Sequence, residues 1–238
     1  MFHVLPGRCL LCDARTNRQR DLCIPCEQDL PWLKSSCRLC AVPVHDHVSV
    51  CGRCLSEPPP FVSSHAGFAY SWPIDQLLHN FKDHADLPAR RVLSELHVKS
   101  LGNSLAYDKS DVIVPVPLHR RKERERGFNQ SFEVATQLAK LWHVPIDHNC
   151  KQLKLTSDQK LLTVNQRGLS VKDAFFTTGT YQGKHLIIVD DVITTTSTVR
   201  SLSRVMLDAG AASVKTVCLA RTPAEHYGCG KVSAIKLQ

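Results

Sequence analysis

The sequence predicts an α/β protein with a parallel sheet, preceded by a small metal-held module. From residue 111 onward, short apolar runs alternate with helical patterns, which is typical of parallel strands joined by right-handed crossovers. Residues 185–191 form an apolar run ending in two acids, as expected of a buried central strand. Four C-x-x-C pairs stand before residue 55, in a segment with few other core-forming residues.

The four C-x-x-C pairs predict zinc. Each pair offers two ligands from one turn, and a tetrahedral zinc site takes four thiolates. We therefore expect about two structural zinc ions per chain. Sequential pairing of the motifs is favoured, but a crossed arrangement, first pair with third, is also open. His45 and His47 lie between pairs and could substitute as ligands, although solvated loop histidines are the simpler interpretation. The expected ligands are Cys9, Cys12, Cys23, Cys26, Cys37, Cys40, Cys51 and Cys54.

Size and charge restrict the protein class. The chain has 238 residues, enough for one ordinary domain and a small one. Its formal charge of +8 falls to about +4 once eight thiolates bind two divalent ions. Charge alone is therefore a weak argument for nucleic-acid binding. No apolar run is long enough to predict a membrane span and the first residues do not resemble a secretory signal, so a cytoplasmic protein is expected.

The expected domains are a double zinc ribbon over residues 1–56, a stiff linker over 57–60 and an α/β domain over 61–238. The proline-rich stretch before residue 61 predicts the linker, and the core beyond it is expected to fold independently. The α/β domain should begin with a short strand at 68–70. Helices should follow over 72–84 and 87–102, the second with an apolar stripe of Val92, Leu93 and Leu96.

The remaining elements follow in order. Residues 111–117 predict a strand, and 128–142 predict a helix facing the sheet. Residues 151–173 are irregular and could form a mobile hood over a pocket, with Arg167 reaching in. The strand at 185–191, a helix to Gly210 and a strand at 213–220 complete the pattern. The apolar stripe of the helix at 128–142 comprises Phe128, Phe132, Val134, Ala135, Leu138, Ala139, Leu141 and Trp142.

An acidic pair and a hydroxyl-rich run stand where a strand meets a helix. Asp190 and Asp191 end the strand, and Val199, Leu202 and Met206 begin the helical spacing. Ligands of open α/β sheets bind at this edge, and the free amides of a helix start favour phosphate. Carboxylates suit hydroxyls or a hydrated metal ion instead. Together they predict a ribose phosphate site, with helix capping as the plainer alternative. The phosphate loop would be Thr194, Thr195, Thr196, Ser197 and Thr198.

A cationic stretch follows the strand at 111–117. Glu123 and Glu125 interrupt it. Its position at a strand end favours an anion site, for pyrophosphate or a nucleic-acid backbone. A solvated surface run with i,i+4 ion pairs is the alternative. The expected anion rim comprises Arg120, Arg121, Lys122, Arg124 and Arg126, with Asn129 and Gln130 at the entrance of the next helix.

The segment DDVITTTST resembles the phosphoribosyl-diphosphate (PRPP) loop of type I phosphoribosyltransferases, with Thr196 at the family glycine. Glycine there permits positive φ and close approach of the backbone to phosphate. The motifs PVPLH, RERGFNQS and VDDVxTTxST, with CGRCLSEPPP before them, resemble the ComF family, including ComFC-type competence proteins. The stretch from Gln159 through Arg167 to Phe175 is also similar, with Leu161 for the usual glycine and Ser170 for the usual asparagine.

The resemblance implies a type I phosphoribosyltransferase-like fold behind a double zinc ribbon, and a role in natural transformation. Such a protein would handle incoming single-stranded DNA with a competence helicase or other DNA-processing proteins, which could recruit it to the inner face of the membrane. Asp190 and Asp191 would be the catalytic acids of a PRPP pocket that uses magnesium, with Arg167 at the phosphates. The departures predict weak or absent transfer activity. The alternative is an active phosphoribosyltransferase with an unidentified acceptor.

The DNA-handling hypothesis also names side chains that could stack on bases. Trp32, Phe61 and Trp72 are the candidates. Ordinary packing is the alternative for each of them.

Overall fold

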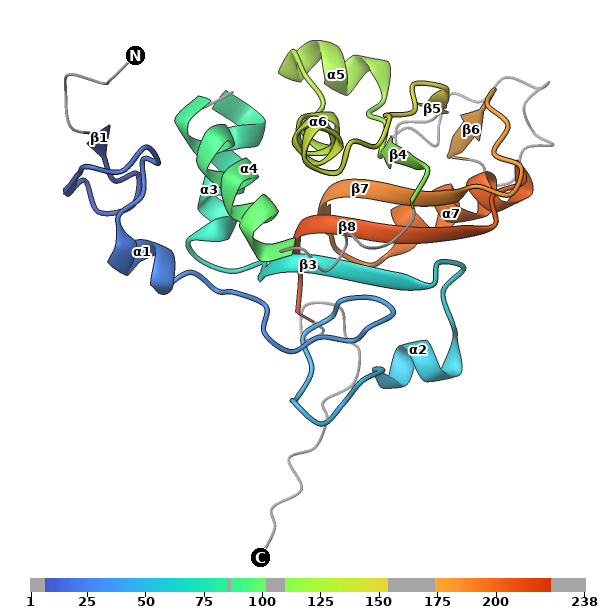
Figure 1. Cartoon of the computed structure of the whole chain (residues 1–238), viewed down its shortest axis with the longest axis horizontal. Coiled ribbons are helices and arrows are strands. Elements are labelled where there is room, and N and C mark those ends of the chain that lie inside the picture. The colour runs from blue at the N-terminus through green and yellow to red at the C-terminus, as the bar shows by residue number, and fades with distance from the viewer. Residues whose placement is uncertain (1–6, 85–86, 102–109, 154–173, 224–238) are drawn as a thin grey trace, which may run out of the picture.

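A four-stranded parallel sheet forms the centre of the molecule. The structure is a computed structural model that describes residues 7–84, 87–101, 110–153 and 174–223. The strand order is β3-β8-β7-β4, and all three pairings are parallel. Figure 1 shows the sheet nearly edge-on, with layers on both sides. The strands are β3 (Ser63–Ala69), β4 (Val112–Pro115), β7 (His185–Ile193) and β8 (Ser213–Arg221).

Both faces of the sheet are buried, because side chains along each strand alternate between two hydrophobic clusters. On β7, Ile187 and Val189 belong to one cluster, whereas Leu186 and Ile188 belong to the other. All four are almost inaccessible to solvent. Burial on both faces explains why the sequence of β7 reads as a continuous apolar run rather than an alternating one.

Three helices cover one face: α3 (Ile74–His84), α4 (Leu87–Leu101) and α6 (Gln130–Trp142). The stripe predicted for α4 is confirmed, since Val92, Leu93 and Leu96 are fully buried. On α6, Leu138 packs into the same cluster, but Leu141 is 46% exposed. The prediction that Leu141 widens the buried stripe is therefore wrong.

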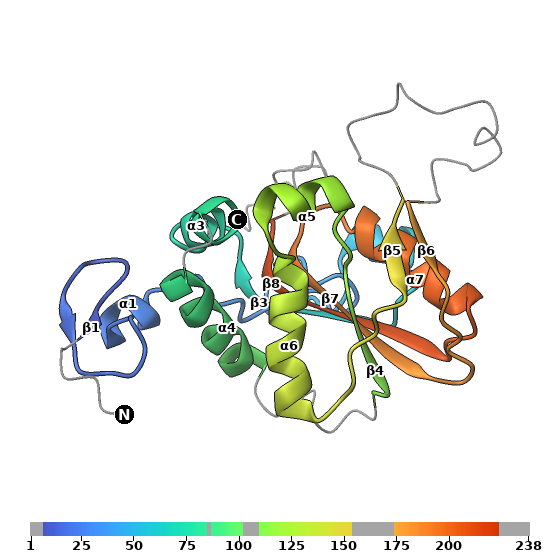
Figure 2. The ribbon, with the colours of Figure 1, turned by 90° about the horizontal axis from the view of Figure 1, so that it is seen from above.

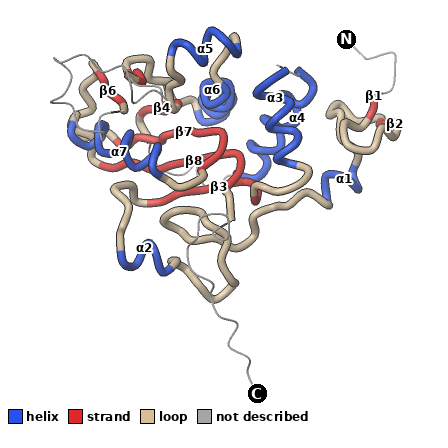
Figure 3. Tube along the Cα trace, turned by 180° about the vertical axis from the view of Figure 1, so that it is seen from behind, coloured by secondary structure: helices blue, strands red, loops and turns tan. Residues whose placement is uncertain are grey.

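The opposite face of the sheet is covered by α7 (Ser197–Asp208) and by apolar residues that follow the second C-x-x-C pair in the sequence. Val199, Leu202 and Met206 of α7 are buried against the sheet, as their spacing predicts. Gly210, just beyond the helix, has a φ of 97°, which suits the predicted stop. Figure 3 shows α7 and α2 from behind, on the side away from α3 and α4.

The two cysteine-rich segments lie on opposite faces of the sheet and join along the edge of β3. Leu22 and Leu30 of the first segment enter the cluster of α3 and α4, whereas Ala41 of the second enters the cluster of α7. Between them, Leu33 N donates to Gly67 O (3.0 Å), so the chain protects the open edge of β3. The elements here are β1 (Gly7–Arg8), β2 (Arg15–Thr16), α1 (Ile24–Gln28) and α2 (Gly52–Ser56). The core beyond Pro60 is thus shared with the amino-terminal residues, contrary to the expected independence.

Three described elements of the α/β part of the chain were not predicted. The cationic stretch forms a helix, α5 (Arg120–Arg126), and β5 (Cys150–Gln152) pairs antiparallel with β6 (Phe175–Thr177). Near β5, Asp147 N donates to Ile113 O (2.7 Å), which covers the second edge of the sheet. Among the described helices, none has the length and apolar character needed to cross a membrane.

Candidate functional site

The acidic pair lies at the carboxyl end of β7, beside the start of α6. The Ser131 hydroxyl of α6 donates to Asp190 Oδ1 (3.2 Å), and the Asp191 amide donates to the same oxygen (2.9 Å). Asp191 is half-buried, and its Oδ1 accepts from Val192 N (2.7 Å). These bonds fix both carboxyl groups at the sheet edge where the sequence placed them.

Burial gives Asp190 unusual chemistry. Its side chain is 8% exposed. Burial, with the charge of Asp191 beside it, raises the pKa of Asp190 to about 8. A buried carboxyl that holds its proton near neutral pH is poised to exchange it for a cation or a hydroxyl donor. Such a perturbed group at a strand end marks a candidate functional site.

The loop after β7 contains a residue in a left-handed backbone conformation. Thr196, at the N-cap of α7, has φ 66° and ψ −3°, a left-handed conformation that favours glycine. Its side chain is buried, and Arg200 Nε donates to its Oγ1 (3.2 Å). Thr194, Ser197 and Thr198 are exposed. No side chain in the described part of the chain caps the first amides of α7, so the helix start can receive an anion.

The predicted anion rim is a short helix at the end of β4. Arg120, Arg121 and Arg124 are exposed, and Figure 2 shows α5 at the same edge of the sheet where β3 leads into α3. Arg121 forms an i,i+4 ion pair with Glu125 (2.9 Å). Such pairs are what the alternative interpretation, a solvated surface run, predicts. No ion pair within the described ranges involves Arg120 or Arg124. Lys122 and Arg126 are half-buried.

Asn129 and Gln130 lie inside the rim rather than on it. Asn129 is the N-cap of α6: its Oδ1 accepts from Ser131 N (3.0 Å), and its Nδ2 donates to Val116 O (3.0 Å). Gln130 is 1% exposed, and its Oε1 accepts from Arg126 (3.2 Å). Both side chains therefore position the start of α6 and do not present an open surface to a large anion.

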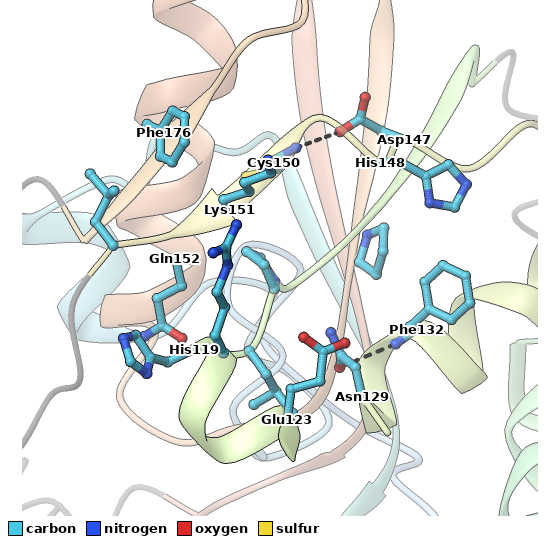
Figure 4. A pocket seen from close by; sticks show the side chains of 15 residues that line it. His119, Glu123, Asn129, Phe132, Asp147, His148, Cys150, Lys151, Gln152 and Phe176 are labelled. Carbon is cyan, nitrogen blue, oxygen red and sulfur yellow. Dashed lines mark hydrogen bonds between the residues drawn. The ribbon is translucent and has the colours of Figure 1, made fainter. Parts of the chain in front are cut away.

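A cavity of about 480 Å³ opens between α5, α6 and the β5–β6 pair. Its wall starts at Pro115, whose register partner on β7, Val189, directly precedes Asp190. Figure 4 shows side chains from α5 facing those of β5 across it. The cavity has cations and acids in equal number, so it suits a polar, partly aromatic ligand rather than a bare anion. Its polar and aromatic lining includes His119, Arg120, Glu123, Asn129, Phe132, Asp147, His148, Lys151, Gln152 and Phe176.

The eight amino-terminal cysteines form two clusters, and within each the sulfur atoms lie within 4.8 Å of one another. The first cluster joins the first two pairs and the second joins the last two, which confirms sequential over crossed pairing. Burial, together with the charge of neighbouring Cys40, raises the pKa of Cys54. Four thiolates this close need a cation, so the donor set fits structural zinc. Neither His45 nor His47 belongs to a cluster.

Of the three aromatic side chains proposed to stack on bases, one is open to solvent. Trp72, between β3 and α3, is 70% exposed. Phe61 is buried, and Trp32 packs on Phe68 with 4.6 Å between ring centroids. Phe61 and Trp32 are therefore packing residues. Arg167, with Leu161 and Ser170, lies outside the described residues.

Sequence reasoning missed three side chains that hold the site. The Ser131 hydroxyl donates to Asp190. In the sequence, Ser131 is the last residue of the RERGFNQS motif, and nothing there indicates a role for it. Arg200 and Arg221 are buried beside the loop. In the sequence, Arg200 looks like a surface residue of an amphipathic helix, and Arg221 looks like the exposed end of a strand. The only available signal was for Arg221, which is an arginine at the end of an otherwise apolar strand.

Comparison with known proteins links both halves of the chain to described families. A double zinc ribbon domain matches residues 2–55, and a phosphoribosyl transferase domain matches residues 130–227. DNA utilization protein YhgH of Escherichia coli (strain K12) is 34% identical over 227 residues, covering 92% of this chain and 98% of that protein. Competence protein F of Haemophilus influenzae is 26% identical, covering 93% and 100%, and competence protein ComFC of Bacillus subtilis is 27% identical, covering 90% and 95%.

Among solved structures, the chain resembles a purine phosphoribosyltransferase from Pyrococcus horikoshii, with 20% identity and a TM-score of 0.38. The match covers 55% of this chain and 73% of that one. A similarity at this level carries no conclusion about activity or substrate.

Proposed function

The chain belongs to the ComF/YhgH family of competence and DNA utilization proteins, in which a double zinc ribbon precedes a phosphoribosyltransferase domain, and we propose that it handles incoming single-stranded DNA in natural transformation. In this proposal it acts in the cytoplasm with a competence helicase or another DNA-processing protein. The observation that carries the proposal is the position of the exposed α5 arginines on the same sheet edge as the acidic pair.

The DNA surface of this proposal consists of α5 and Trp72. Exposed arginines attract phosphates whatever the base sequence, and an exposed indole gives a base a face to stack on. Arg120, Arg124 and Trp72 meet both requirements. Single-stranded DNA is favoured over duplex because its bases are free to stack.

The second part of the proposal is a ribose 5-phosphate pocket that accepts PRPP with magnesium. Asp190 and Asp191 would hold the ribose hydroxyls or the hydrated ion, and the uncapped amides at the start of α7 would hold the 5′-phosphate. Support comes from the hydrogen-bonded carboxyl groups, of which Asp190 is buried, and from the left-handed conformation of Thr196 in the same loop. Transfer activity is expected to be weak or absent, because a β-branched residue strains this loop.

An active phosphoribosyltransferase is the second candidate, favoured by the cavity between α5, α6 and the β5–β6 pair. Its aromatic rings and amide groups could receive an acceptor base. Release of pyrophosphate from PRPP in the presence of candidate bases would support it over a purely binding role.

The triple change of Arg120, Arg121 and Arg124 to alanine should weaken binding of single-stranded DNA at least tenfold at low salt, since about three phosphate contacts would be lost. The slope of log affinity against log salt should become shallower by about 2, because each phosphate contact on a single strand contributes about 0.7 to the slope through counterion release. Fluorescence anisotropy with a labelled oligonucleotide at several salt concentrations measures both quantities.

The matched control removes the same charge elsewhere. Lys140, Lys184 and Arg204 are exposed on other parts of the surface, and alanine at all three should leave the salt slope near that of the parent. If the two triple variants lose affinity equally, binding depends on net charge and α5 is not the DNA surface.

Replacing Thr196 with glycine should tighten PRPP binding by about fivefold. Glycine holds a left-handed conformation without the roughly 1 kcal/mol that a side chain costs there, so the binding conformation of the loop is more populated. The variant also removes the Thr196 hydroxyl that accepts from Arg200, but Arg200 keeps its bonds to the carbonyl oxygens of Glu57 and Pro58. Thr195→Gly is the control, because Thr195 does not have a positive φ and glycine relieves no strain there. Calorimetry with magnesium and PRPP compares them. Equal or weaker binding by Thr196→Gly would contradict the strain argument.

A further inference from the structure

Two buried arginines connect the phosphate loop to the second cysteine cluster. We propose that Arg200 and Arg221 are positioning residues through which metal in the second cluster, Cys37–Cys40–Cys51–Cys54, holds the loop after β7 in its binding conformation. The inference deepens the proposed ribose phosphate pocket and rests on it for its ligand, but not for its geometry.

Arg221 joins the loop to a metal-binding turn. It ends β8 and is 4% exposed. Its Nε donates to the carbonyl oxygen of Cys40 (2.8 Å), and one terminal nitrogen donates to the carbonyl oxygens of Ile193 (3.1 Å) and Thr194. Cys40 is a member of the second cluster. A single guanidinium therefore binds the backbone of a metal ligand and the backbone at the start of the phosphate loop.

Arg200 makes the second connection from the first turn of α7. It donates to Thr196 Oγ1 (3.2 Å) and to the carbonyl oxygen of Glu57 (2.8 Å), and it pairs with the Glu57 carboxylate (3.3 Å). Glu57 follows α2, and its amide donates to Arg53 O (2.8 Å). Cys54, another member of the cluster, lies between Arg53 and Glu57. Arg200 thus connects Thr196, the strained residue of the loop, to the backbone that follows Cys54 of the second cluster.

The partner carbonyls of these arginines depend on the metal for their position. The second cluster has only a small core of its own, in which the cysteines pack with Val42 and a few half-buried residues. Ala41, next to Cys40, is fully buried in a left-handed conformation with φ 55°. A module this small needs its metal to stay folded. Loss of metal should therefore release the oxygens of Cys40 and Glu57. Arg221 and Arg200 would then keep their bonds to the loop but lose the acceptors that connect them to the second cluster.

The first cluster offers an internal control. Its segment is docked to α4 on the opposite side of the sheet, through Glu27, Arg20 and Lys99. None of the hydrogen bonds found in the described part of the chain joins this segment to the loop at 194–198. Metal loss at the first site should leave the loop unchanged.

The experiment compares Cys51→Ser with Cys23→Ser in the full chain. Both residues are half-buried N-caps, of α2 and α1 respectively. Each variant should lose one zinc ion by elemental analysis. Hydrogen exchange of the loop amides at 194–200 should speed up about tenfold in Cys51→Ser, a typical size for coupling between two sites, and remain at the parent rate in Cys23→Ser. Equal loop exchange in the two variants would overturn the proposal.

Arg221→Met and Arg200→Met provide a test that does not require metal loss, and so covers the case in which Cys51→Ser fails to fold. Both should keep two zinc ions and still show faster loop exchange. Parent-like exchange in both would overturn the proposal. Ribose 5-phosphate affinity, measured in parallel, should fall with the loss of loop protection. A parent that does not bind ribose 5-phosphate would refute the proposed pocket, while the exchange data would still decide the coupling.

Discussion

Changing both Asp190 and Asp191 to asparagine should lower the affinity for ribose 5-phosphate by about a hundredfold or more. Hydrogen bonds that involve a charged partner contribute about 1.5–3 kcal/mol each, and this variant weakens two of them. The fold should survive, because asparagine can still accept the hydrogen bonds from Ser131 and from the backbone amide of residue 191. Calorimetry at about pH 9, where Asp190 is ionised, measures the affinity, and circular dichroism confirms folding.

The pH dependence of this site has a defined sign. Burial and Asp191 raise the pKa of Asp190 to about 8, so the carboxyl carries a proton in the free protein at neutral pH. A ligand that needs the carboxylate should bind more tightly as the pH rises from 6 to 9. The folded protein should lose stability relative to Asp190→Asn as the pH rises from about 4 to 8, because the unfolded chain releases this proton first. A parent and variant with identical pH profiles for binding and stability would contradict this role of Asp190.

Replacing Glu27 with alanine should destabilise the protein by about 2–3 kcal/mol, because the buried carboxylate loses its charge-assisted hydrogen bonds while the cations left behind remain partly exposed to solvent. Glu27 is 4% exposed and pairs with Arg18 (2.6 Å), Arg20 (3.1 Å) and Lys99 (2.5 Å). Lys99 belongs to α4, so the carboxylate joins the first cysteine segment to the α/β core. Thermal unfolding of the zinc-loaded protein measures the loss.

The control for Glu27 is Glu125→Ala, which breaks an exposed i,i+4 pair with Arg121 and should cost only about 0.5 kcal/mol. Burial alone would raise the pKa of Glu27, but its ion pairs with Lys99, Arg18 and Arg20 outweigh burial and lower the pKa to about 2. Its contribution should therefore be complete above about pH 4.5 and disappear as the pH falls toward 2. Similar losses for the two variants would mean that Glu27 does not anchor the first segment.

The parts of the fold that were predictable from the sequence are those with strong local signals. The C-x-x-C spacing and its sequential pairing, the buried strand β7 and the helix α7 all follow from patterns within a few residues. The position of Asp190 follows too, since a strand end in a parallel sheet has one possible edge. Helix α5 was missed because its charged residues have no apolar stripe, and its N-cap is a histidine rather than a usual capping residue.

What the sequence could not predict depends on contacts between distant residues. Arg221 and Cys40 are 181 positions apart, and Arg200 and Glu57 are 143 apart. No local pattern marks such pairs. The same reason explains why the amino-terminal segment looked independent: Leu22 and Leu30 enter the core of α3 and α4 only in three dimensions. Trp72 and Phe61 look alike in sequence, and only the fold distinguishes the exposed ring from the buried one.

The most direct test of the proposed function is one titration of zinc-loaded protein with a labelled single-stranded oligonucleotide, at low salt, with and without saturating magnesium and PRPP. We expect saturable DNA binding that weakens when PRPP is present, because the pyrophosphate and the DNA phosphates would use the same cations at the sheet edge. Absence of DNA binding at low salt would contradict the proposed function, and DNA binding unaffected by bound PRPP would contradict a shared edge.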